Sequence, residues 1–305
     1  AVAAGMNPMD LDKVDIKLES PVGSNVRPAG QDIQVGEKVL SKGVVLRPGE
    51  IGVIASLGRN KVKVIRRPSI AVLATGDELI EPGNPPVEGR IYDSNSYGVC
   101  ASVAKYGGRP TFLGIAQDNL MSMNSKIEEG FHADMILTSA GVSKGDYDIV
   151  KDVLVSRGEI DFWSVRMRPA KPLAFGVLFS DDGKKIPHIG LPGNPVSALV
   201  AFEELVRPAI LKMMGYKELD KPTVKAVLED DIVNTDGRRV YARAIITNKD
   251  GKYYASLTGN QGSNVLTSMV RANGLAICPE DVECMKAGEE VEVQMLDWAD
   301  GGYSR

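Results

Sequence analysis

The middle of the chain alternates between two hydrophobic patterns. Short, largely apolar runs are typical of strands buried on both faces of a sheet, and they occupy residues 70–74, 112–116 and 135–138. Longer stretches with the apolar spacing of helices lie at residues 94–106, 121–131 and 147–157. Strand and helix alternate in this way up to about Gly215, which predicts an α/β fold with βαβ units, right-handed crossovers and a parallel sheet.

Both flanks of this region show strand patterns instead. Before Ser69, glycines and prolines recur every few residues, and residues 61–65 alternate polar and apolar side chains as a half-buried strand does. This pattern predicts a small β-rich segment that is too thin to be a complete domain. After Pro222 strand-like runs return between the turn dipeptides Asp236-Gly237 and Asp250-Gly251, which predicts a small β-barrel or sandwich.

The amino-acid composition excludes several classes of protein and of partner. The 305 residues are 43% apolar and 25% charged, which excludes collagen-like and disordered chains. The 36 basic and 40 acidic residues give a net charge of −4, so we expect no nucleic-acid partner. Three cysteines without a CxxC pair favour a reduced, cytoplasmic protein, and two histidines argue against a histidine-based zinc site. No apolar run is long enough for a bilayer, so we expect no membrane partner.

Polar loops follow the predicted strands at Thr75, Ser139 and Leu191. Because parallel sheets bind ligands beyond the carboxyl ends of their strands, we expect these loops to converge on one site. Adjacent acids after the first strand could hold Mg²⁺ or lie solvated in a turn, and the residues alone leave both open. The small residues at 139–148 are equally compatible with an anion-binding loop and with a plain turn.

Two further segments bear on an anionic ligand. Arg166, Arg168 and Lys171 are three cations within six residues of a net-acidic chain, stiffened by neighbouring prolines. Asn194 and Pro195 are typical of a helix start. A solvated face and a well-capped helix explain much of these patterns, so they do not by themselves establish a site.

Taken in chain order, five motifs resemble those of the molybdopterin molybdotransferases, the family of MoeA and the gephyrin E domain. They are TGDEL at 75–79, SAGVSKGDYD at 139–148, RMRPAKP at 166–172, LPGNPVS at 191–197 and QGS at 261–263. The segment at 22–33 also fits, so the resemblance covers nearly the whole chain.

This resemblance implies three parts. Residues 67–217 would form a MogA-like α/β domain that binds molybdopterin, with a mostly parallel sheet and helices on both faces. Residues 218–305 would form the C-terminal β-barrel. Residues 1–66 would be an incomplete, β-rich remnant of the N-terminal domains. The family's SAMDGYA-type motif is absent, so we expect an N-terminally truncated chain.

The resemblance also implies an activity, which is Mg²⁺-dependent insertion of molybdate into adenylylated molybdopterin with release of AMP, by a homodimer. The acids that match the magnesium positions are Glu78, Asp118 and Asp148. The catalytic set that the resemblance implies contains these three acids together with Lys171 and Asp32. Asp32 matches an acid that, in the family's dimer, approaches the active site of the partner. The residues that match the molybdate positions are Arg168, Lys171, Pro172, Ser197, Arg243 and Ser263. Those that match the molybdopterin-binding positions are Gly141, Val142, Ser143, Gly145, Pro192, Gly193, Asn194 and Pro195.

Some positions depart from the family pattern. Ala140 and Ala170 stand where the family usually has glycine, and Arg168 stands where lysine is common. Two other functions stay open, a molybdopterin-binding scaffold without catalysis and adenylyl transfer to molybdopterin. The C-terminal β domain and Arg243 argue against adenylyl transfer.

Overall fold

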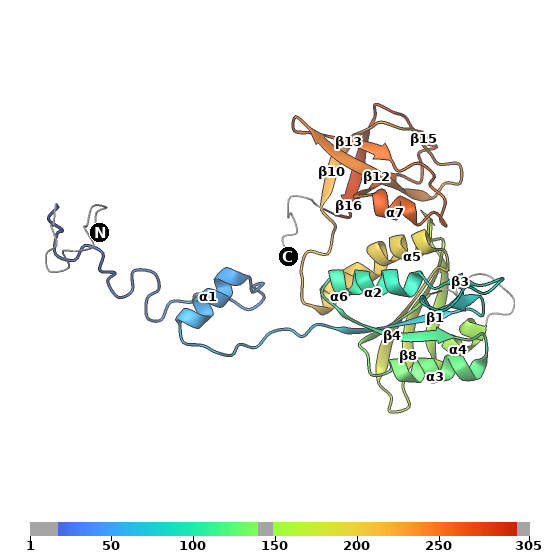
Figure 1. Cartoon of the computed structure of the whole chain (residues 1–305), viewed down its shortest axis with the longest axis horizontal. Helices are drawn as coiled ribbons and strands as arrows, with labels where there is room; N and C mark the ends of the chain where they lie inside the picture. Colours follow the sequence, from blue (N-terminus) through green and yellow to red (C-terminus); the bar gives the residue numbers. More distant parts are fainter. Residues whose placement is uncertain (1–17, 140–148, 298–305) are drawn as a thin grey trace, which may run out of the picture. The chain divides into compact units, whose positions relative to one another are not determined.

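A computed structural model describes residues 18–139 and 149–297 (Figure 1). The chain divides into two compact units, residues 1–61 and residues 62–305, and each is described by itself. None of the helices in the described ranges has the length and apolar character that crossing a membrane requires.

In residues 18–61, the described part of the first unit, there is one helix, α1 (Pro48–Ser56), which has proline at its first position. The Glu50 carboxylate accepts the Arg47 backbone N–H at 2.9 Å. The expected β-rich character of residues 1–66 is wrong for the described part, because residues 18–66 contain no strand. Glycines with positive φ turn the chain repeatedly in this segment, for example at Gly30 and Gly43. Within the described ranges residues 61–65 pair with no strand, and their apolar side chains are exposed.

The second unit is built on a six-stranded sheet with the order β4-β1-β5-β9-β8-β6. Its strands are β1 (Ser69–Thr75), β4 (Arg109–Ala116), β5 (Met135–Ser139), β6 (Gly158–Ser164), β8 (Pro172–Phe179) and β9 (Lys185–Leu191). Strands β4, β1, β5 and β9 run parallel, whereas β8 is antiparallel to both of its neighbours. The mostly parallel sheet is confirmed. Simple strand-helix alternation up to Gly215 is not, because β6, β8 and β9 follow one another without a helix between them.

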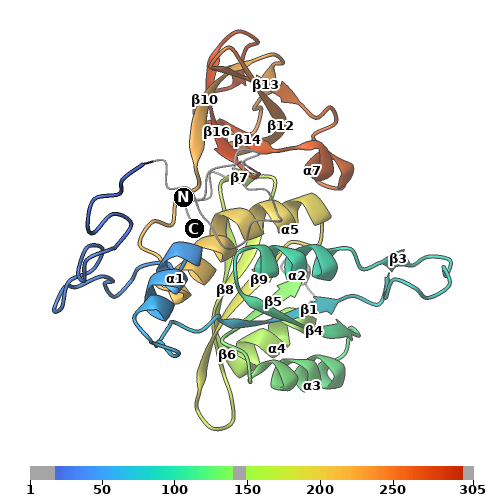
Figure 2. The same cartoon turned by 60° about the vertical axis from the view of Figure 1, so that its left-hand side comes forward.

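Helices cover both faces of this sheet (Figure 2). The helices are α2 (Asn95–Lys105), α3 (Leu120–Gly130), α4 (Ile149–Arg157), α5 (Pro195–Ala201), the π-helix η1 (Phe202–Val206) and α6 (Arg207–Met213). On one face α2, α5, η1 and α6 bury Ile70, Val72 and Leu137, and on the other α3 and α4 bury Leu73 and Ile136. Because successive side chains of one strand point to opposite faces and both faces are covered by helices, the strand sequences are continuously apolar.

The C-terminal part is a closed barrel of five strands, as the order β13-β10-β16-β14-β12 returns to β13. The elements of this part are β10 (Thr223–Leu228), β11 (Ile232–Val233), β12 (Arg239–Lys249), β13 (Lys252–Leu257), α7 (Thr267–Arg271), β14 (Gly274–Cys278), β15 (Cys284–Met285) and β16 (Glu290–Met295). A barrel is therefore confirmed, where the pattern alone left barrel and sandwich open.

The α/β part and the barrel are joined by strand pairing and by a shared core. The short strand β7 (Met167–Arg168), which precedes β8 in the chain, pairs with β12 of the barrel. Tyr241 and Leu275 of the barrel lie in the same apolar cluster as Val196 of α5 and Leu191 of β9. The short pair β2 (Leu79–Ile80) and β3 (Ile91–Tyr92) extends from the end of β1.

A buried polar cluster fixes the connection between the two parts. Lys221, in the segment that leads into the barrel, forms an ion pair with Glu203 of η1. The Tyr106 hydroxyl donates to the same carboxylate at 2.8 Å, and Arg207 donates to the Leu219 carbonyl at 2.6 Å. Because a buried charge left unpaired is costly, these contacts hold the connecting segment against η1 and α6.

One prediction concerns His188, which is fully buried in β9 with its Nε2 atom 3.1 Å from Thr138 Oγ1. Burial lowers the pKa of His188 to about 3, whereas the unfolded chain takes up this proton near pH 6.5. The contribution of neutral, buried His188 to the free energy of unfolding is therefore present above pH 6.5 and is lost as the pH falls toward 3. Between pH 7 and pH 5 we expect His188 to account for a loss of about 2 kcal/mol of unfolding free energy.

Urea unfolding of the wild-type chain and of a His188→Gln variant at the two pH values measures this difference. The variant should lose less stability on acidification by that amount. Equal losses in the two proteins would contradict the assignment.

Candidate functional site

The Asn95 side chain, at the start of α2, joins the end of β5 to the loop after β9. Its Nδ2 atom donates to Ser139 Oγ at 2.9 Å, at the end of β5, and to the Gly193 carbonyl at 2.7 Å, just after β9. Thr75 Oγ1, at the end of β1, donates to the Ser139 carbonyl at 3.3 Å. The ends of β1, β5 and β9, where the three predicted loops start, therefore lie together, while residues 140–148 of the second loop lie outside the described residues.

The loop after β9 turns directly into α5. Pro192 is buried, Gly193 and Asn194 are exposed, and Pro195 occupies the first helical position. The Asn194 side chain forms no capping hydrogen bond, although its backbone carbonyl accepts the Ala198 N–H at 2.9 Å. The predicted helix start is correct in position, and the proline rather than the asparagine side chain shapes it.

The barrel brings its own loop to the start of α5. The Val196 backbone N–H donates to the Ser263 carbonyl at 3.1 Å, so Ser263 lies against the turn that contains the buried Ser197. These two residues are 66 positions apart in the sequence. The contact confirms that a barrel loop and the first turn of α5 belong to one place in the fold.

Arg243 lies beneath this barrel loop and is only 1% exposed. Its Nε atom donates to Ser268 Oγ at 3.2 Å, and one of its terminal nitrogens, Nη2, donates to the Gly262 carbonyl at 3.2 Å. Gln261 fixes the Arg243 backbone, accepting its N–H at 2.8 Å and donating to its carbonyl at 3.1 Å.

No carboxylate forms an ion pair with Arg243 among the residues that the structure describes. Burial alone lowers the pKa of Arg243 to about 10, so the guanidinium keeps its charge at neutral pH. A buried cation without an acidic partner is costly unless a ligand compensates it. The arrangement therefore favours an anion beside Arg243, Ser263 and Ser197.

The remaining members of the predicted molybdate set are Arg168 of β7, Lys171 in the turn that follows, and Pro172 at the start of β8. Ala174 of β8 is opposite Gly190 of β9, so the start of β8 at Pro172 lies level with Pro192, at the same edge of the sheet. Lys171 is exposed and forms no ion pair within the described residues. Arg168 instead faces the barrel, where it donates to the Val233 carbonyl and lies 3.7 Å from Asp236.

Ala170 has a φ of +74° and is buried. Residues with a Cβ atom adopt this left-handed conformation at a cost that glycine avoids. The geometry explains why glycine is usual at this position in the family that the motifs resemble.

Acidic side chains line the loops after β1 and β4. Asp77 Oδ1 accepts the Asp118 backbone N–H at 3.1 Å, which ties the two loops together. The Glu78 carboxylate folds back over Gly76, where an added Cβ would lie 2.5 Å from Glu78 Oε2. Gly76, with a φ of +136°, is therefore required for this position of Glu78.

These oxygen donors have the chemistry that Mg²⁺ prefers, and two of the three predicted metal ligands, Glu78 and Asp118, come from neighbouring strand ends. The third, Asp148, lies outside the described residues, as do Gly141, Val142, Ser143 and Gly145. Within the described ranges, no group of three or more acidic, histidine or cysteine side chains is assembled that could hold a metal.

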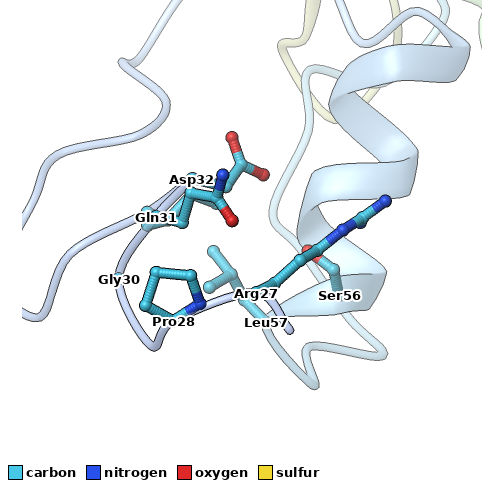
Figure 3. Close-up of a pocket in the computed structure, with 8 residues that line it drawn as sticks. Arg27, Pro28, Gly30, Gln31, Asp32, Ser56 and Leu57 are labelled. Atoms are coloured by element: carbon cyan, nitrogen blue, oxygen red, sulfur yellow. The ribbon is translucent and has the colours of Figure 1, made fainter. Parts of the chain in front are cut away.

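Asp32 belongs to the first unit, where it lines a shallow pocket of about 660 Å³ with Arg27, Gln31 and Leu57. Figure 3 shows Asp32 and Gln31 on one side of this pocket and the Arg27 side chain extending past Ser56 of α1. Gln31 and Asp32 are exposed, so among the described residues of this unit the Asp32 carboxylate is open to water.

Sequence reasoning missed three residues of the site, namely Asn95, Gln261 as a backbone clamp, and Ser268. Asn95 follows Asp93 and Ser94 in the chain. The Asp93 carboxylate provides that cap, accepting the Ser96 N–H at 3.0 Å. The signal for Asn95 was its place at a helix start beside the strand ends, since an amide there is free to bridge loops.

Family models match almost the whole chain in three segments. Residues 7–58 match the MoeA N-terminal region (domains I and II), residues 71–212 a probable molybdopterin binding domain, and residues 225–296 the MoeA C-terminal region (domain IV).

Individual relatives agree with these models. The chain is 36% identical over 277 residues to a molybdopterin molybdenumtransferase of Haemophilus influenzae, which covers 88% of this chain and 66% of the relative. It is 34% identical over 290 residues to molybdopterin molybdenumtransferase 2 of Mycobacterium tuberculosis, covering 93% of this chain and 70% of that protein.

The crystal structure of a molybdopterin biosynthesis MoeA protein from Pyrococcus horikoshii superposes with a TM-score of 0.73 at 31% identity, covering 88% of this chain and 64% of that one. The chain thus spans about two thirds of the length of these relatives. From the segment matches and these identities, the chain belongs to the MoeA family of molybdopterin molybdenumtransferases.

Proposed function

We propose that this chain is a molybdopterin molybdenumtransferase, which inserts molybdate into adenylylated molybdopterin and releases AMP. The relatives that carry this name support the proposal. The observation that carries it is the buried, uncompensated Arg243 at the meeting point of the barrel loop and α5. Molybdate is a tetrahedral dianion, so it supplies the negative charge that this position needs.

The molybdate position is built from both parts of the second unit. Arg243 supplies a fixed guanidinium from the barrel, and Ser263 and Ser197 supply hydroxyls from the two sides of the joint. Lys171 and Pro172 lie at the same edge of the sheet and add charge and rigidity. Because these groups are held by backbone contacts before any ligand arrives, binding requires little reorganisation.

The adenylylated pterin would occupy the loops at the strand ends. Pro192, Gly193, Asn194 and Pro195 offer close backbone approach beside Asn95, and the 141–145 loop completes the set by its motif. Glu78, Asp118 and Asp148 would hold Mg²⁺, which when bound polarises a phosphate and activates water. Asp32 and Arg168 are included in the proposed site only because their sequence motifs resemble those of the family.

The first prediction concerns Arg243→Met. Removing the buried charge should leave the ligand-free protein about as stable or more stable, since a hydrophobic replacement avoids the desolvation cost. Molybdate should raise the melting temperature of the wild type and leave that of Arg243→Met unchanged. Thermal denaturation with and without molybdate measures both effects. Sulfate, also a tetrahedral dianion, is measured in parallel for comparison. A molybdate shift that persists in the variant would contradict the anion site.

A second prediction concerns the acids. Asp148→Asn and Glu78→Gln should reduce AMP release from adenylylated molybdopterin by at least about a hundredfold, since each removes a charged donor from the proposed metal site. Both variants should keep the molybdate-dependent melting shift, because they leave Arg243 in place. AMP release by chromatography is the measurement, and unchanged turnover would remove these acids from the reaction. Pterin binding without AMP release by the wild type would favour the scaffold function.

A third prediction concerns Asn95 as a positioning residue. Asn95→Ala removes the hydrogen bonds to Ser139, at the end of β5, and to Gly193, just after β9. The KM for adenylylated molybdopterin should therefore rise about tenfold or more. Asn124→Ala is the matched control, because Asn124 donates to a backbone carbonyl within α3, away from these loops. Steady-state kinetics measure the difference. Equal KM values for the two variants would show that the bridge does not organise the site.

A further inference from the structure

Arg243 is held separately at its backbone and at its charged end. Gln261 binds the backbone on both sides, accepting the Arg243 N–H at 2.8 Å and donating to its carbonyl at 3.1 Å. The guanidinium is held instead by Ser268 and by the Gly262 carbonyl. Gln261 therefore fixes where the side chain starts, whereas the other two groups fix how the guanidinium is turned.

These contacts use two of the five N–H donors of the guanidinium. Nε donates its single N–H to Ser268 Oγ, and Nη2 donates one N–H to the Gly262 carbonyl, both at 3.2 Å. Within the described residues Nη1 donates to no group. The three remaining N–H donors thus all belong to the terminal nitrogens, so a bidentate ligand can be bound only by Nη1 and Nη2.

The terminal nitrogens lie on the side of the proposed oxyanion site. Nη2 contacts Gly262, the residue before Ser263, whose carbonyl accepts the Val196 N–H at the start of α5. Nη1 is not one of the fully buried, unpartnered polar atoms of the described residues. It therefore keeps accessible surface, although Arg243 as a whole is 1% exposed.

The two acceptors that hold the guanidinium are themselves connected through Val265. Ser268, which is 2% exposed on the short helix α7, donates its hydroxyl proton to the Val265 carbonyl at 2.7 Å. The Val265 N–H in turn donates to the Gly262 carbonyl at 3.2 Å. Because its one proton is already used, the Ser268 hydroxyl can only accept from Arg243.

An arginine side chain has many rotamers, and a ligand that must select one of them binds more weakly. The bond from Nε to Ser268 removes much of that freedom before a ligand arrives. It also satisfies a donor that is costly to leave unpaired in a buried position. Ser268 thus lowers the cost of presenting the terminal nitrogens to an anion.

We propose that Ser268 is a positioning residue for the molybdate site. By accepting the Nε N–H, it turns the Arg243 guanidinium so that Nη1 and Nη2 present paired donors to two oxygens of the oxyanion. Ser268 acts through Arg243, not on the ligand directly. This inference rests on the proposed function and adds the group that orients its buried cation.

Ser268→Ala removes the acceptor, so the dissociation constant for molybdate should rise by at least about tenfold. Melting temperatures over a range of molybdate concentrations measure it. The KM for molybdate should rise similarly, whereas the KM for adenylylated molybdopterin should stay at the wild-type value. A rise in both KM values, or an unchanged molybdate affinity, would overturn the proposal.

Ser156→Ala is the matched control. The Ser156 hydroxyl also donates to the carbonyl three residues earlier, that of Val153 at 2.8 Å, but in α4 and, among the described residues, without a bonded arginine. This variant should bind molybdate like the wild type. Circular dichroism checks that each variant is folded. Ser268→Cys, which nearly keeps the volume but offers only a weak acceptor, serves as the test variant if Ser268→Ala does not fold.

An Arg243→Lys background separates positioning from a purely structural role. Lysine keeps the charge but has no Nε donor, so Ser268→Ala should cause no further loss of molybdate affinity in this background. The same loss in both backgrounds would show that Ser268 only supports the fold, and would overturn the proposal. Failure of the proposed site itself is distinguishable, because the molybdate shift would then persist in Arg243→Met.

Discussion

One shared apolar core joins the α/β part to the barrel, and the candidate site depends on it. The cluster contains Leu191 at the end of β9, Val196 at the start of α5, and Tyr241 and Leu275 of the barrel. Because densely packed interiors deform little, this core fixes the barrel loop against the first turn of α5. The ion pair between Lys221 and Glu203 holds the connecting segment in the same arrangement. Arg243 can therefore remain buried beneath that loop, where it donates to the Gly262 carbonyl and Ser268 Oγ.

Much of the fold could be predicted because its signals are local. The apolar run at 70–74 and the helical spacing at 94–106 are close to β1 and α2 as observed. The failures arise where pairing partners are distant. Residues 61–65 have a strand pattern but pair with no strand in the part of the chain that the structure describes, and the hairpin of β8 and β9 interrupts the alternation of strand and helix. Periodicity reports which faces of an element can be buried, not what lies beside it.

The site shows the same division. The sequence pattern indicated that loops after β1, β5 and β9 would converge, because parallel strands end at one edge. It could not indicate that Asn95 bridges two of them, since a helix-start asparagine usually reads as a cap. Nor could it separate Arg168, which contacts Asp236 and the Val233 carbonyl, from Arg243, which forms no ion pair within the described residues. Both are arginines in strands, and only their three-dimensional surroundings distinguish an ion-paired cation from an uncompensated one.

The two-residue strand β7 affects what happens to the barrel when it is separated from the rest of the chain. It pairs with β12 although it belongs, in chain order, to the α/β part, and Arg239 donates its backbone N–H to the Arg166 carbonyl at 2.9 Å. A barrel excised at Pro222 would lose this covering and expose the flank of β12 to solvent and to other chains. The C-terminal part is thus a contiguous stretch of sequence whose sheet also includes a strand from an earlier part of the chain, and a gene fusion that keeps the complete strand pairing has to include the β7 segment.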